Sequence, residues 1–378
     1  MVKHAPIKIG MVVGKMVGGG VESVVLDILK YADKKKYSID FIVDEDSTLV
    51  PIDFINEYGG NVYYVPPYQH LLGYMKSLYK LLKKNNYTIV HSNISSLNVF
   101  PLFIAYVSGV PIRIAHNHNL IAPGAGRLKN ILKYILSYSN TLFPNYMIAP
   151  TRNAGKWVFR NKSFTVISNG INACNFMYSE ADRKRIRESL GIGNGDFVFG
   201  SFGRMVSSKR IGLILDVVKK IIVSGNSNIK LLLVGNGPQL PDLKMAVDKD
   251  IDLKRHVILL PNQSDISGYY SSIDAYVFPS SSEAFGMAAV EAQTNGLVVY
   301  VSNGVPDEAR VSEKLFRRIS DDSVNAWAEE LTKAIENNYD RLSLSKSVVN
   351  SDRLSSKNMV RKIENVYDKA VQKYEKEN

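Results

Sequence analysis

The residues best suited to chemistry lie in the run 282–291, where Glu283 precedes a turn at Gly286 and Glu291 follows it. The preceding segment 274–279 predicts a buried strand, and 287–293 favours a helix. The free N–H groups of a first helical turn bind anions, and carboxylates accept hydrogen bonds from sugar and ribose hydroxyls. The run therefore predicts a site for a ligand with both phosphate and hydroxyl groups, as in a nucleotide sugar.

Two cations follow another predicted strand, 197–202. Arg204 and Lys209 lie in the loop after this strand, next to Gly203. Such a pair suits a diphosphate, because the guanidinium binds two oxygens at once and the ammonium adds a point charge. A pair of ordinary surface cations is the simpler interpretation, but their position in one strand-end loop favours an anion site.

A glycine turn at Gly18, Gly19 and Gly20 separates a predicted strand, 7–13, from a predicted helix, 21–31. Glycine in such a turn lets the backbone approach a phosphate closely. The turn matches neither the dinucleotide pattern G-x-G-x-x-G nor the Walker spacing. Taken alone, it is compatible with a phosphate site and equally with an ordinary tight turn.

The charge of the chain is uneven. The net charge is +11, and residues 1–170 hold 19 Lys and Arg against 9 Asp and Glu. No carboxylate occurs between Glu57 and Glu180, although the interval carries 12 Lys and Arg. The excess predicts an anionic partner. Acid–base chemistry in the interval would have to use histidine, and His91, His116 and His118 lie at or just after predicted strand ends.

Two predicted helices in this interval are amphipathic and basic. Segment 71–84 has an apolar stripe (Leu71, Leu72, Met75, Leu78, Tyr79 and Leu82) beside Lys76, Lys80, Lys83 and Lys84, and segment 127–142 carries Arg127, Lys129 and Lys133. A core-facing stripe with a solvated basic face would explain either helix alone. The lack of carboxylates favours contact with anionic lipid headgroups.

Strands and helices are predicted to alternate twice along the 378 residues, with short connections. The pattern is typical of doubly wound parallel sheets, which bind ligands at the carboxyl ends of their strands. A polar, glycine-rich passage at 168–195 separates the two alternations. We therefore expect an α/β protein with two Rossmann-like parallel-sheet domains facing across a cleft.

Composition disfavours several classes of protein. No apolar run approaches the ~20 residues of a membrane span, and the amino terminus lacks a signal-peptide pattern. The single cysteine, Cys174, excludes internal disulfides and cysteine metal sites. These features predict a cytoplasmic protein.

Together the motifs resemble retaining glycosyltransferases of the GT-B fold, family 4 (glycosyl transferases group 1), of the capsule and exopolysaccharide type. The match is most specific at Glu283-x7-Glu291, then at Gly203-Arg204-x4-Lys209. The other matching segments are 18–22, 113–119, 168–172 and 234–238. The resemblance implies an acceptor-binding domain at 1–170, a nucleotide-sugar-binding domain at 171–355, and a helix at 356–378 that returns to the first domain.

The resemblance also implies residue roles. Arg204 and Lys209 would hold the diphosphate, Glu283 the donor hexose and Glu291 the ribose. His116 would face the reacting centre and completes the catalytic set with Glu283, Arg204 and Lys209. His118 and Asn119 are second choices, on the acceptor side. The remaining donor contacts would be Gly19, Gly20, Gly235, Asn236, the base-binding residues Pro261, Asn262 and Ile266, and the backbone of Phe285, Gly286 and Met287.

We predict a metal-independent, front-face reaction in which cations and helix N-termini stabilise the leaving nucleoside diphosphate. No Asp-x-Asp motif lies where a diphosphate-bound metal would be held. A double displacement needs a carboxylate nucleophile, which residues 58–179 lack. The leaving phosphate would help to deprotonate the acceptor while His116 orients a hydroxyl. No cofactor is expected, because the nucleotide sugar, a UDP-sugar in our interpretation, is a co-substrate.

The expected acceptor is a lipid-linked (polyprenyl-diphosphate) glycan of bacterial surface polysaccharide synthesis, met at the inner face of the plasma membrane. A nucleotide-sugar epimerase or a glycan phosphorylase on the same fold remains an alternative. So does a basic nucleic-acid-binding protein without catalysis, although no nucleic-acid module is recognisable and no nucleic-acid partner is expected. An NAD dehydrogenase is disfavoured, because the dinucleotide glycine fingerprint is missing.

Overall fold

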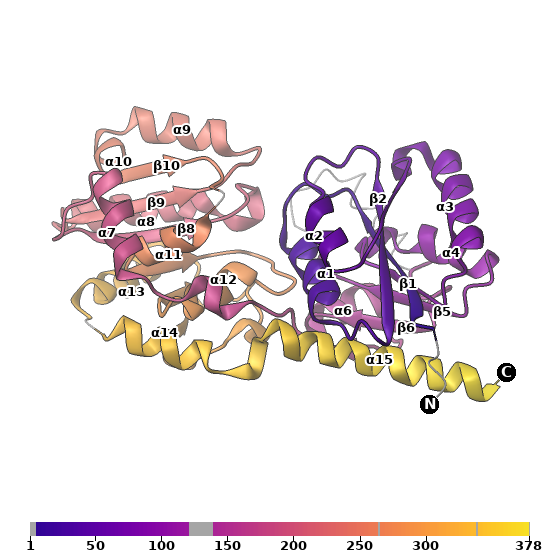
Figure 1. Ribbon diagram of the computed structural model, residues 1–378. Helices are drawn as coiled ribbons and strands as arrows, with labels where there is room; N and C mark the ends of the chain where they lie inside the picture. The colour runs from indigo at the N-terminus through magenta and orange to yellow at the C-terminus, as the bar shows by residue number, and fades with distance from the viewer. Residues whose placement is uncertain (1–4, 121–138, 264, 338, 378) are drawn as a thin grey trace. The chain divides into compact units, whose positions relative to one another are not determined.

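The computed structural model describes residues 5–120, 139–263, 265–337 and 339–377 (Figure 1). These residues form two compact units. Unit 1 contains the chain up to Gly170 together with the carboxyl-terminal segment from Leu354, and unit 2 contains Ile171–Arg353. The predicted membrane-facing residues Arg127, Lys129 and Lys133 lie outside the described residues.

Unit 1 is built on a sheet with the strand order β3-β2-β1-β4-β5-β6-β7, in which neighbouring strands pair in parallel. The strands are β1 Ile7–Gly14, β2 Tyr37–Asp44, β3 Val62–Val65, β4 Ile89–Ser92, β5 Ile112–His116, β6 Tyr146–Ala149 and β7 Thr165–Val166. The helices are α1 Gly20–Tyr31, α2 Ile52–Glu57, α3 Leu71–Asn85, α4 Val99–Val107, α6 Arg152–Phe159 and α15 Ser356–Glu377.

Alternate residues of β1 face opposite layers of unit 1. Ile9 and Met11 belong to a core cluster that includes α1 and α15, whereas Val12 belongs to a cluster that includes α3 and α4. The strand period of two produces this division. The helix α15, yellow in Figure 1, packs beside α1 and buries Met359, Val360, Ile363, Tyr367, Ala370 and Val371. Spacings of three and four place these residues on one helical face, so α15 is part of the unit 1 core.

Unit 2 is built on a second parallel sheet, with the order β10-β9-β8-β11-β12-β13. The strands are β8 Phe197–Phe202, β9 Ile229–Val234, β10 Val257–Leu260, β11 Ala275–Phe278, β12 Val298–Val301 and β13 Phe316–Arg318. The helices are α7 Glu180–Ser189, α8 Ile211–Val223, α9 Leu240–Lys249, α10 Ile251–His256, α11 Ile266–Ser272, α12 Met287–Thr294, α13 Val324–Glu336 and α14 Arg341–Val349. Its apolar core gathers residues of β8, β9, α8 and α13 around the buried Trp327.

The predicted α/β class with two Rossmann-like parallel-sheet domains is confirmed. Among the described α-helices and strands, α6, α10, β13 and α14 were not predicted. Gly155 inside α6 weakens the helical pattern, but a Cβ at this position would lie 2.0 Å from the Phe164 ring, so close packing requires the glycine. The hydroxyl of Thr151 caps this helix by accepting from the Ala154 N–H at 3.1 Å.

The predicted apolar stripe of α3 was partly wrong. The buried face consists of Tyr74, Leu78 and Leu82, spaced by four. Leu72 and Tyr79 lie on the outside, 84% and 40% exposed. The helix has apolar residues around more than half of its circumference, and pattern alone does not show which part faces the sheet. None of the described helices combines the length and apolarity that crossing a membrane requires.

Candidate active site

The loops after β8 and β9 in unit 2 are held together by close backbone contact. The Gly203 N–H donates to the Val234 carbonyl and the Met205 N–H to the Asn236 carbonyl, both at 2.9 Å. A Cβ on Gly235 would lie 1.9 Å from the Gly203 oxygen. A side chain at Gly235 is therefore excluded, and the loop that carries Arg204 is fixed against the loop that carries Asn236.

Lys209 and Glu283 form a direct ion pair at the same edge of the sheet. Lys209 ends the short 3₁₀ turn Ser207–Lys209, and its Nζ lies 2.5 Å from Glu283 Oε1. The ammonium also lies 4.5 Å from the centre of the Phe278 ring, within the range of a cation–π contact. The Glu283 N–H donates to the Gly304 carbonyl at 2.9 Å, which fixes the backbone of the run. The structure thus brings together two residues predicted for different parts of the donor.

Glu291 is the third charged group of this cluster. It lies on α12, and its Oε2 accepts a hydrogen bond of 2.8 Å from the hydroxyl of the buried Tyr270. Burial raises the pKa of Glu291, while the Tyr270 hydroxyl and the positive charge of Lys209 act in the opposite direction. One carboxylate oxygen is therefore oriented by Tyr270, and the other is left to accept from a ligand hydroxyl.

The helix α12 begins where the sequence predicted an anion site. Gly286 precedes it with φ +95°, a left-handed conformation that favours glycine. The Phe285 side chain is only 2% exposed and packs in the core, so only its backbone is available to a ligand. Met287 opens the helix with a half-buried side chain. The arrangement leaves the first N–H groups of α12 as donors beside Glu283.

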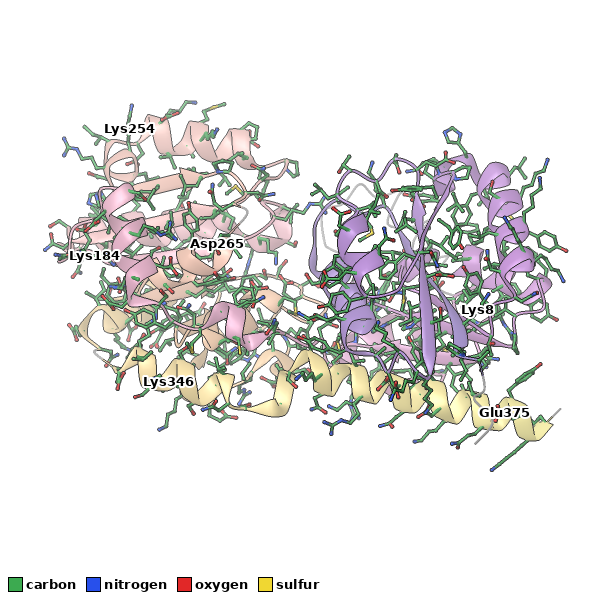
Figure 2. All side chains as sticks on the ribbon, viewed as in Figure 1. Lys8, Lys184, Lys254, Asp265, Lys346 and Glu375 are labelled. Atoms are coloured by element: carbon green, nitrogen blue, oxygen red, sulfur yellow. The ribbon has the colours of Figure 1, made fainter. Side chains whose placement is uncertain are left out.

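The remaining predicted donor contacts in unit 2 lie on neighbouring strand ends. Arg204 is exposed and has no side-chain partner among the described residues. Pro261 and Asn262 follow β10 and are exposed, and Ile266 opens α11 just after Asp265, which Figure 2 labels. All of these loops leave the carboxyl edge of one parallel sheet, where doubly wound folds bind ligands.

In unit 1 the glycine turn between β1 and α1 is closed by a glutamate. The two carboxylate oxygens of Glu22 accept from the backbone N–H groups of Val17 and Gly18, at 2.8 and 2.7 Å. Gly18 has φ +87°, whereas Gly19 is extended at −178° and caps α1. Space is open around Gly19, where an added Cβ would meet no atom within 4 Å. The turn therefore presents the backbone of Gly19 and Gly20 outward.

Three buried histidines lie at the carboxyl edge of the unit 1 sheet. His116 ends β5, and its Nδ1 lies 3.2 Å from Nε2 of His91 on β4. The ring centres of His116 and His118 are 4.0 Å apart. The His118 Nε2 lies 2.9 Å from Oδ1 of Asn93. The buried nitrogens His116 Nε2 and His118 Nδ1 have no hydrogen-bond partner within the described part of the chain. Asn119 is exposed beside them, and its carbonyl accepts from Asn117 Nδ2.

Burial lowers the pKa of all three histidines. The values fall to about 3 for His91 and His118, and the pKa of His116 lies well below its usual value. Desolvation is the main cause, and the neighbouring imidazoles add to it at His91 and His116. All three rings are therefore neutral near pH 7. His116 can orient a substrate by hydrogen bonding, but it does not carry a positive charge there.

Sequence reasoning missed Tyr270 and Tyr367. The Tyr367 hydroxyl, on α15, lies 2.6 Å from His91 Nδ1 although 276 residues separate them. No local spacing reveals such a contact. Asp44 was also passed over: it ends β2, is 3% exposed, and burial and the nearby Asp46 raise its pKa to about 6. Its place at a strand end was the signal that could have identified it.

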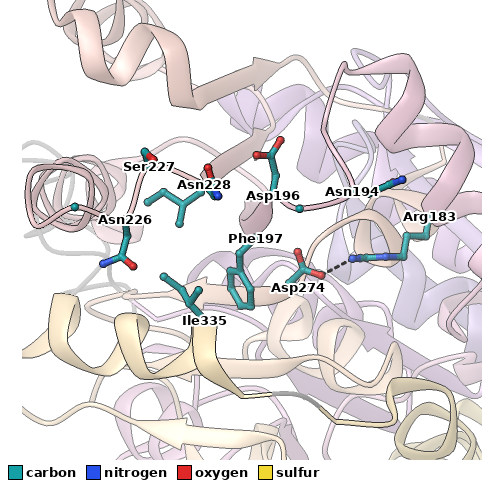
Figure 3. A pocket seen from close by; sticks show the side chains of 12 residues that line it. Arg183, Asn194, Asp196, Phe197, Asn226, Ser227, Asn228, Asp274 and Ile335 are labelled. Carbon is teal, nitrogen blue, oxygen red and sulfur yellow. Dashed lines mark hydrogen bonds and ion pairs between the residues drawn. The ribbon is translucent and has the colours of Figure 1, made fainter.

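A separate hollow of about 480 Å³ lies at the opposite, amino-terminal edge of the unit 2 sheet (Figure 3). Asp196, Phe197 and Asn228 line it, and Arg183 pairs across it with Asp274 at 2.6 Å. Apart from Arg183, which lies on α7, these residues precede or begin strands, whereas the predicted donor residues follow strands. We therefore assign the candidate active site to the carboxyl edge and not to this hollow. In the described parts of both units, no group of three or more His, Cys, Asp or Glu is arranged to hold a metal ion.

Two protein-family models match the chain and together span most of it. The model described as "Glycosyl transferases group 1" matches residues 182–350, and the model described as "Glycosyltransferase Family 4" matches residues 18–173. The first covers Lys209, Glu283 and Glu291, and the second covers the glycine turn and His116.

Curated relatives and solved structures agree with these matches. A UDP-Gal:alpha-D-GlcNAc-diphosphoundecaprenol alpha-1,3-galactosyltransferase of Escherichia coli is 27% identical over 79% of this chain and 80% of its own length. The capsular polysaccharide biosynthesis glycosyltransferase CapM of Staphylococcus aureus is 24% identical over 75% of this chain and 83% of its own. The structure of Anabaena HepE in complex with UDP-glucose superposes with a TM-score of 0.79 at 18% identity, covering 96% of this chain and 100% of that one. At this identity the superposition establishes the fold alone.

Proposed function

The chain belongs to the group 1 glycosyltransferases, the retaining GT-B family 4, and we propose that it moves a hexose or N-acetylhexosamine from a UDP-sugar to a lipid-linked glycan in bacterial surface polysaccharide synthesis. The observation that carries the proposal is the cluster of Lys209, Glu283 and Glu291 at the carboxyl edge of the unit 2 sheet. It combines a cation for phosphate with two carboxylates for hydroxyl groups, which are the chemical groups of a nucleotide sugar.

The donor would bind to unit 2 in an orientation that follows from the positions of these groups. Lys209 and Arg204 bind the diphosphate, and the N–H groups at the start of α12 add further donors. Glu283 accepts from hydroxyls of the transferred sugar, and Glu291, oriented by Tyr270, accepts from the ribose. The loop with Pro261, Asn262 and Ile266 faces the base. The structural relative bound to UDP-glucose supports a UDP-sugar as the donor.

The reaction would proceed on the front face of the sugar. The leaving diphosphate takes the acceptor proton, and cationic and backbone donors stabilise the charge that develops on it. The ring of His116 is neutral, so it would contribute a hydrogen bond that orients a sugar hydroxyl and not a positive charge. Among the described unit 1 strands, β2 ends in a buried carboxylate, Asp44. Replacement of Asp44 by Asn tests whether it takes part in the reaction. Unchanged turnover in Asp44→Asn would support the front-face route over a double displacement.

A lipid-linked acceptor is supported by the outer face of α3. Lys76, Lys80, Lys83 and Lys84 are exposed there, and the exposed Leu72 and Tyr79 lie among them. Basic side chains beside exposed apolar and aromatic ones suit the interface of an anionic membrane. The acceptor in the name of the Escherichia coli relative, alpha-D-GlcNAc-diphosphoundecaprenol, is likewise an anionic lipid, because a diphosphate joins its sugar to the polyprenol. These observations support our proposal that the enzyme acts at the cytoplasmic face of the membrane.

A donor screen tests the proposal. The purified protein is incubated with individual UDP-sugars and detergent-solubilised polyprenyl-diphosphate glycans, and UDP release and the glycosylated lipid are both measured. We expect UDP release that depends on the lipid and yields a product of retained configuration. Conversion of the UDP-sugar without any acceptor would instead identify an epimerase. Absence of turnover with every lipid-linked glycan, together with turnover on a soluble sugar, would overturn the acceptor assignment.

A further inference from the structure

A continuous hydrogen-bonded chain of three side chains crosses unit 1. The Tyr367 hydroxyl on α15 lies 2.6 Å from His91 Nδ1, and His91 Nε2 lies 3.2 Å from His116 Nδ1. Tyr367 and His91 are fully buried, and His116 is 1% exposed. The chain ends at His116 Nε2, a buried atom without a partner among the described residues. The carboxyl-terminal helix is thereby connected to the imidazole at the end of β5.

Only two proton arrangements satisfy this chain, because the rings are neutral and each link needs one donor and one acceptor. In the first, the Tyr367 hydroxyl donates to His91, His91 Nε2–H donates to His116 Nδ1, and His116 carries its proton on Nε2. In the second, every bond is reversed and His116 Nε2 is a bare acceptor. The second arrangement leaves the proton of Tyr367 without an acceptor in the described core of unit 1.

The energetic difference between the arrangements favours the first. A buried donor without a partner is costly, and in the second arrangement that donor is enclosed by α15 and the sheet, where no substrate reaches it. In the first arrangement the unpartnered donor is His116 Nε2–H, which is also buried but lies at the carboxyl edge of the sheet, the edge at which doubly wound folds bind ligands. The ring of Tyr367 is itself held edge-on by Tyr37, with ring centres 5.4 Å apart.

We propose that Tyr367 and His91 are positioning residues that hold His116 in its Nε2–H tautomer, so that it donates a hydrogen bond to a hydroxyl or developing anionic oxygen of the sugar substrates. The proposal rests on the role of His116 in the proposed function. It assigns to the carboxyl-terminal helix a part in the reaction that goes beyond packing. It also predicts that His116 acts as a donor and not as a base.

Tyr367→Phe tests the proposal with little disturbance, because it removes one hydroxyl and keeps the ring. We expect kcat about five- to tenfold lower, the scale of one lost hydrogen bond, with the KM for the donor unchanged. The matched control is Tyr37→Phe. Its hydroxyl also contacts α15, through Asp368, but lies outside the chain to His116. Equal activity of the two variants would overturn the proposal, as would an effect on KM alone.

The tautomer can be read directly in the wild-type protein. In protein labelled with ¹⁵N-histidine, long-range proton–nitrogen correlations distinguish the protonated ring nitrogen from the bare one. His118 serves as an internal reference: the Asn93 amide nitrogen donates to backbone carbonyls, so Asn93 Oδ1 must accept from His118 Nε2–H. We expect the Nε2–H form for His116, and a mixed population in Tyr367→Phe but not in Tyr37→Phe. A wild-type Nδ1–H form at His116 would mean that every hydrogen bond in the chain has the opposite direction, and it would contradict the proposal.

A His116→Ala variant separates this inference from the function on which it rests. If His116→Ala lowers transfer at least tenfold and Tyr367→Phe leaves kcat unchanged, the positioning chain is wrong and the role of His116 stands. If His116→Ala transfers sugar at the wild-type rate, the role of His116 itself is wrong, and the spectra then describe only a structural hydrogen bond.

Discussion

The ammonium of Lys209 lies 2.5 Å from a carboxylate oxygen of Glu283, so the cation proposed for the diphosphate and the carboxylate proposed for the sugar form one ion pair. Both side chains are largely buried, at 22% and 14% exposed, and solvent screens the pair only weakly. The diphosphate and the sugar hydroxyls would then compete with this pair for the same two groups. The two residues should therefore act as a unit in donor binding.

Replacing Lys209 or Glu283 by Ala should each lower kcat/KM by about a hundredfold or more, the scale of losing one charged contact in a catalytic site. The double variant should lose much less than the product of the two effects, with a coupling of about 0.5–3 kcal/mol. Steady-state UDP release measures kcat/KM for the two single variants and for the double variant. The control is Lys219→Ala, which breaks a surface ion pair with Asp250 in the same unit and should leave turnover unchanged. Additive losses would show that the pair does not act as a unit.

Glu291 should determine selectivity for ribose over 2′-deoxyribose. Its carboxylate accepts from Tyr270, and a hydrogen bond to a charged group contributes about 1.5–3 kcal/mol. Glu291→Gln should weaken UDP binding about tenfold or more and bring the affinities for UDP and 2′-deoxy-UDP close together. Titration calorimetry with both nucleotides measures this. Tyr270→Phe, which frees the carboxylate without removing it, should cause a smaller loss. A variant that keeps the wild-type preference for UDP would place Glu291 away from the ribose.

The sequence was sufficient for most of the fold, because fully buried parallel strands are short apolar runs. β8 has the predicted bounds for this reason, and β11 lies within the predicted strand 274–279. The rule that ligands bind at carboxyl strand ends also placed Lys209 and Glu283 at one edge. Their direct contact, across 74 residues of sequence, required the structure. The predicted roles of the site residues remain predictions.

What the sequence did not predict depends on tertiary contacts. The link from Tyr367 to His91 spans 276 residues, and a tyrosine on an amphipathic helix otherwise indicates only core packing. The outward position of Leu72 was missed because the burial of α3 is decided by the sheet beneath it. In both cases the residue type was visible in the sequence and the neighbour was not.

Neutralising the outer face of α3 should weaken membrane binding. Lys76, Lys80, Lys83 and Lys84 replaced together by Gln should lower affinity for anionic liposomes by about a thousandfold at low salt, at about 1 kcal/mol for each lysine near the surface. Wild-type binding should also fall as salt rises. Liposome sedimentation measures both. The matched control replaces four exposed lysines of α15, Lys362, Lys369, Lys373 and Lys376, and changes the net charge equally. Equal losses in the two variants would indicate a general charge effect and remove the assignment to α3.

The buried histidines should make unit 1 sensitive to mild acid. Their pKa values lie below the ordinary value of 6.5 in the folded chain, to about 3 at His91 and His118, so below pH 6.5 the unfolded chain binds protons that the folded chain does not. The part of the free energy of unfolding that depends on these neutral histidines is therefore fully present above pH 6.5 and is lost as pH falls toward 3. Between pH 7 and 5.5 each histidine should lower the free energy of unfolding by about 1 kcal/mol, and the three together by about 3–4 kcal/mol. Asp44 acts oppositely, because its raised pKa of about 6 favours its protonation in the folded chain, and it offsets part of this loss.

Urea unfolding at pH 7 and at pH 5.5 measures this dependence, with few ordinary carboxylates titrating in the window. His118→Gln should reduce the pH-dependent loss by about 1 kcal/mol, because one buried neutral imidazole is removed. Replacing His70, which lies in the turn before α3 and is exposed, should leave the loss unchanged and serves as the control. A wild-type protein equally stable at both pH values would mean that the three imidazoles do not remain neutral in the fold, and the donor role of His116 would lose its electrostatic basis.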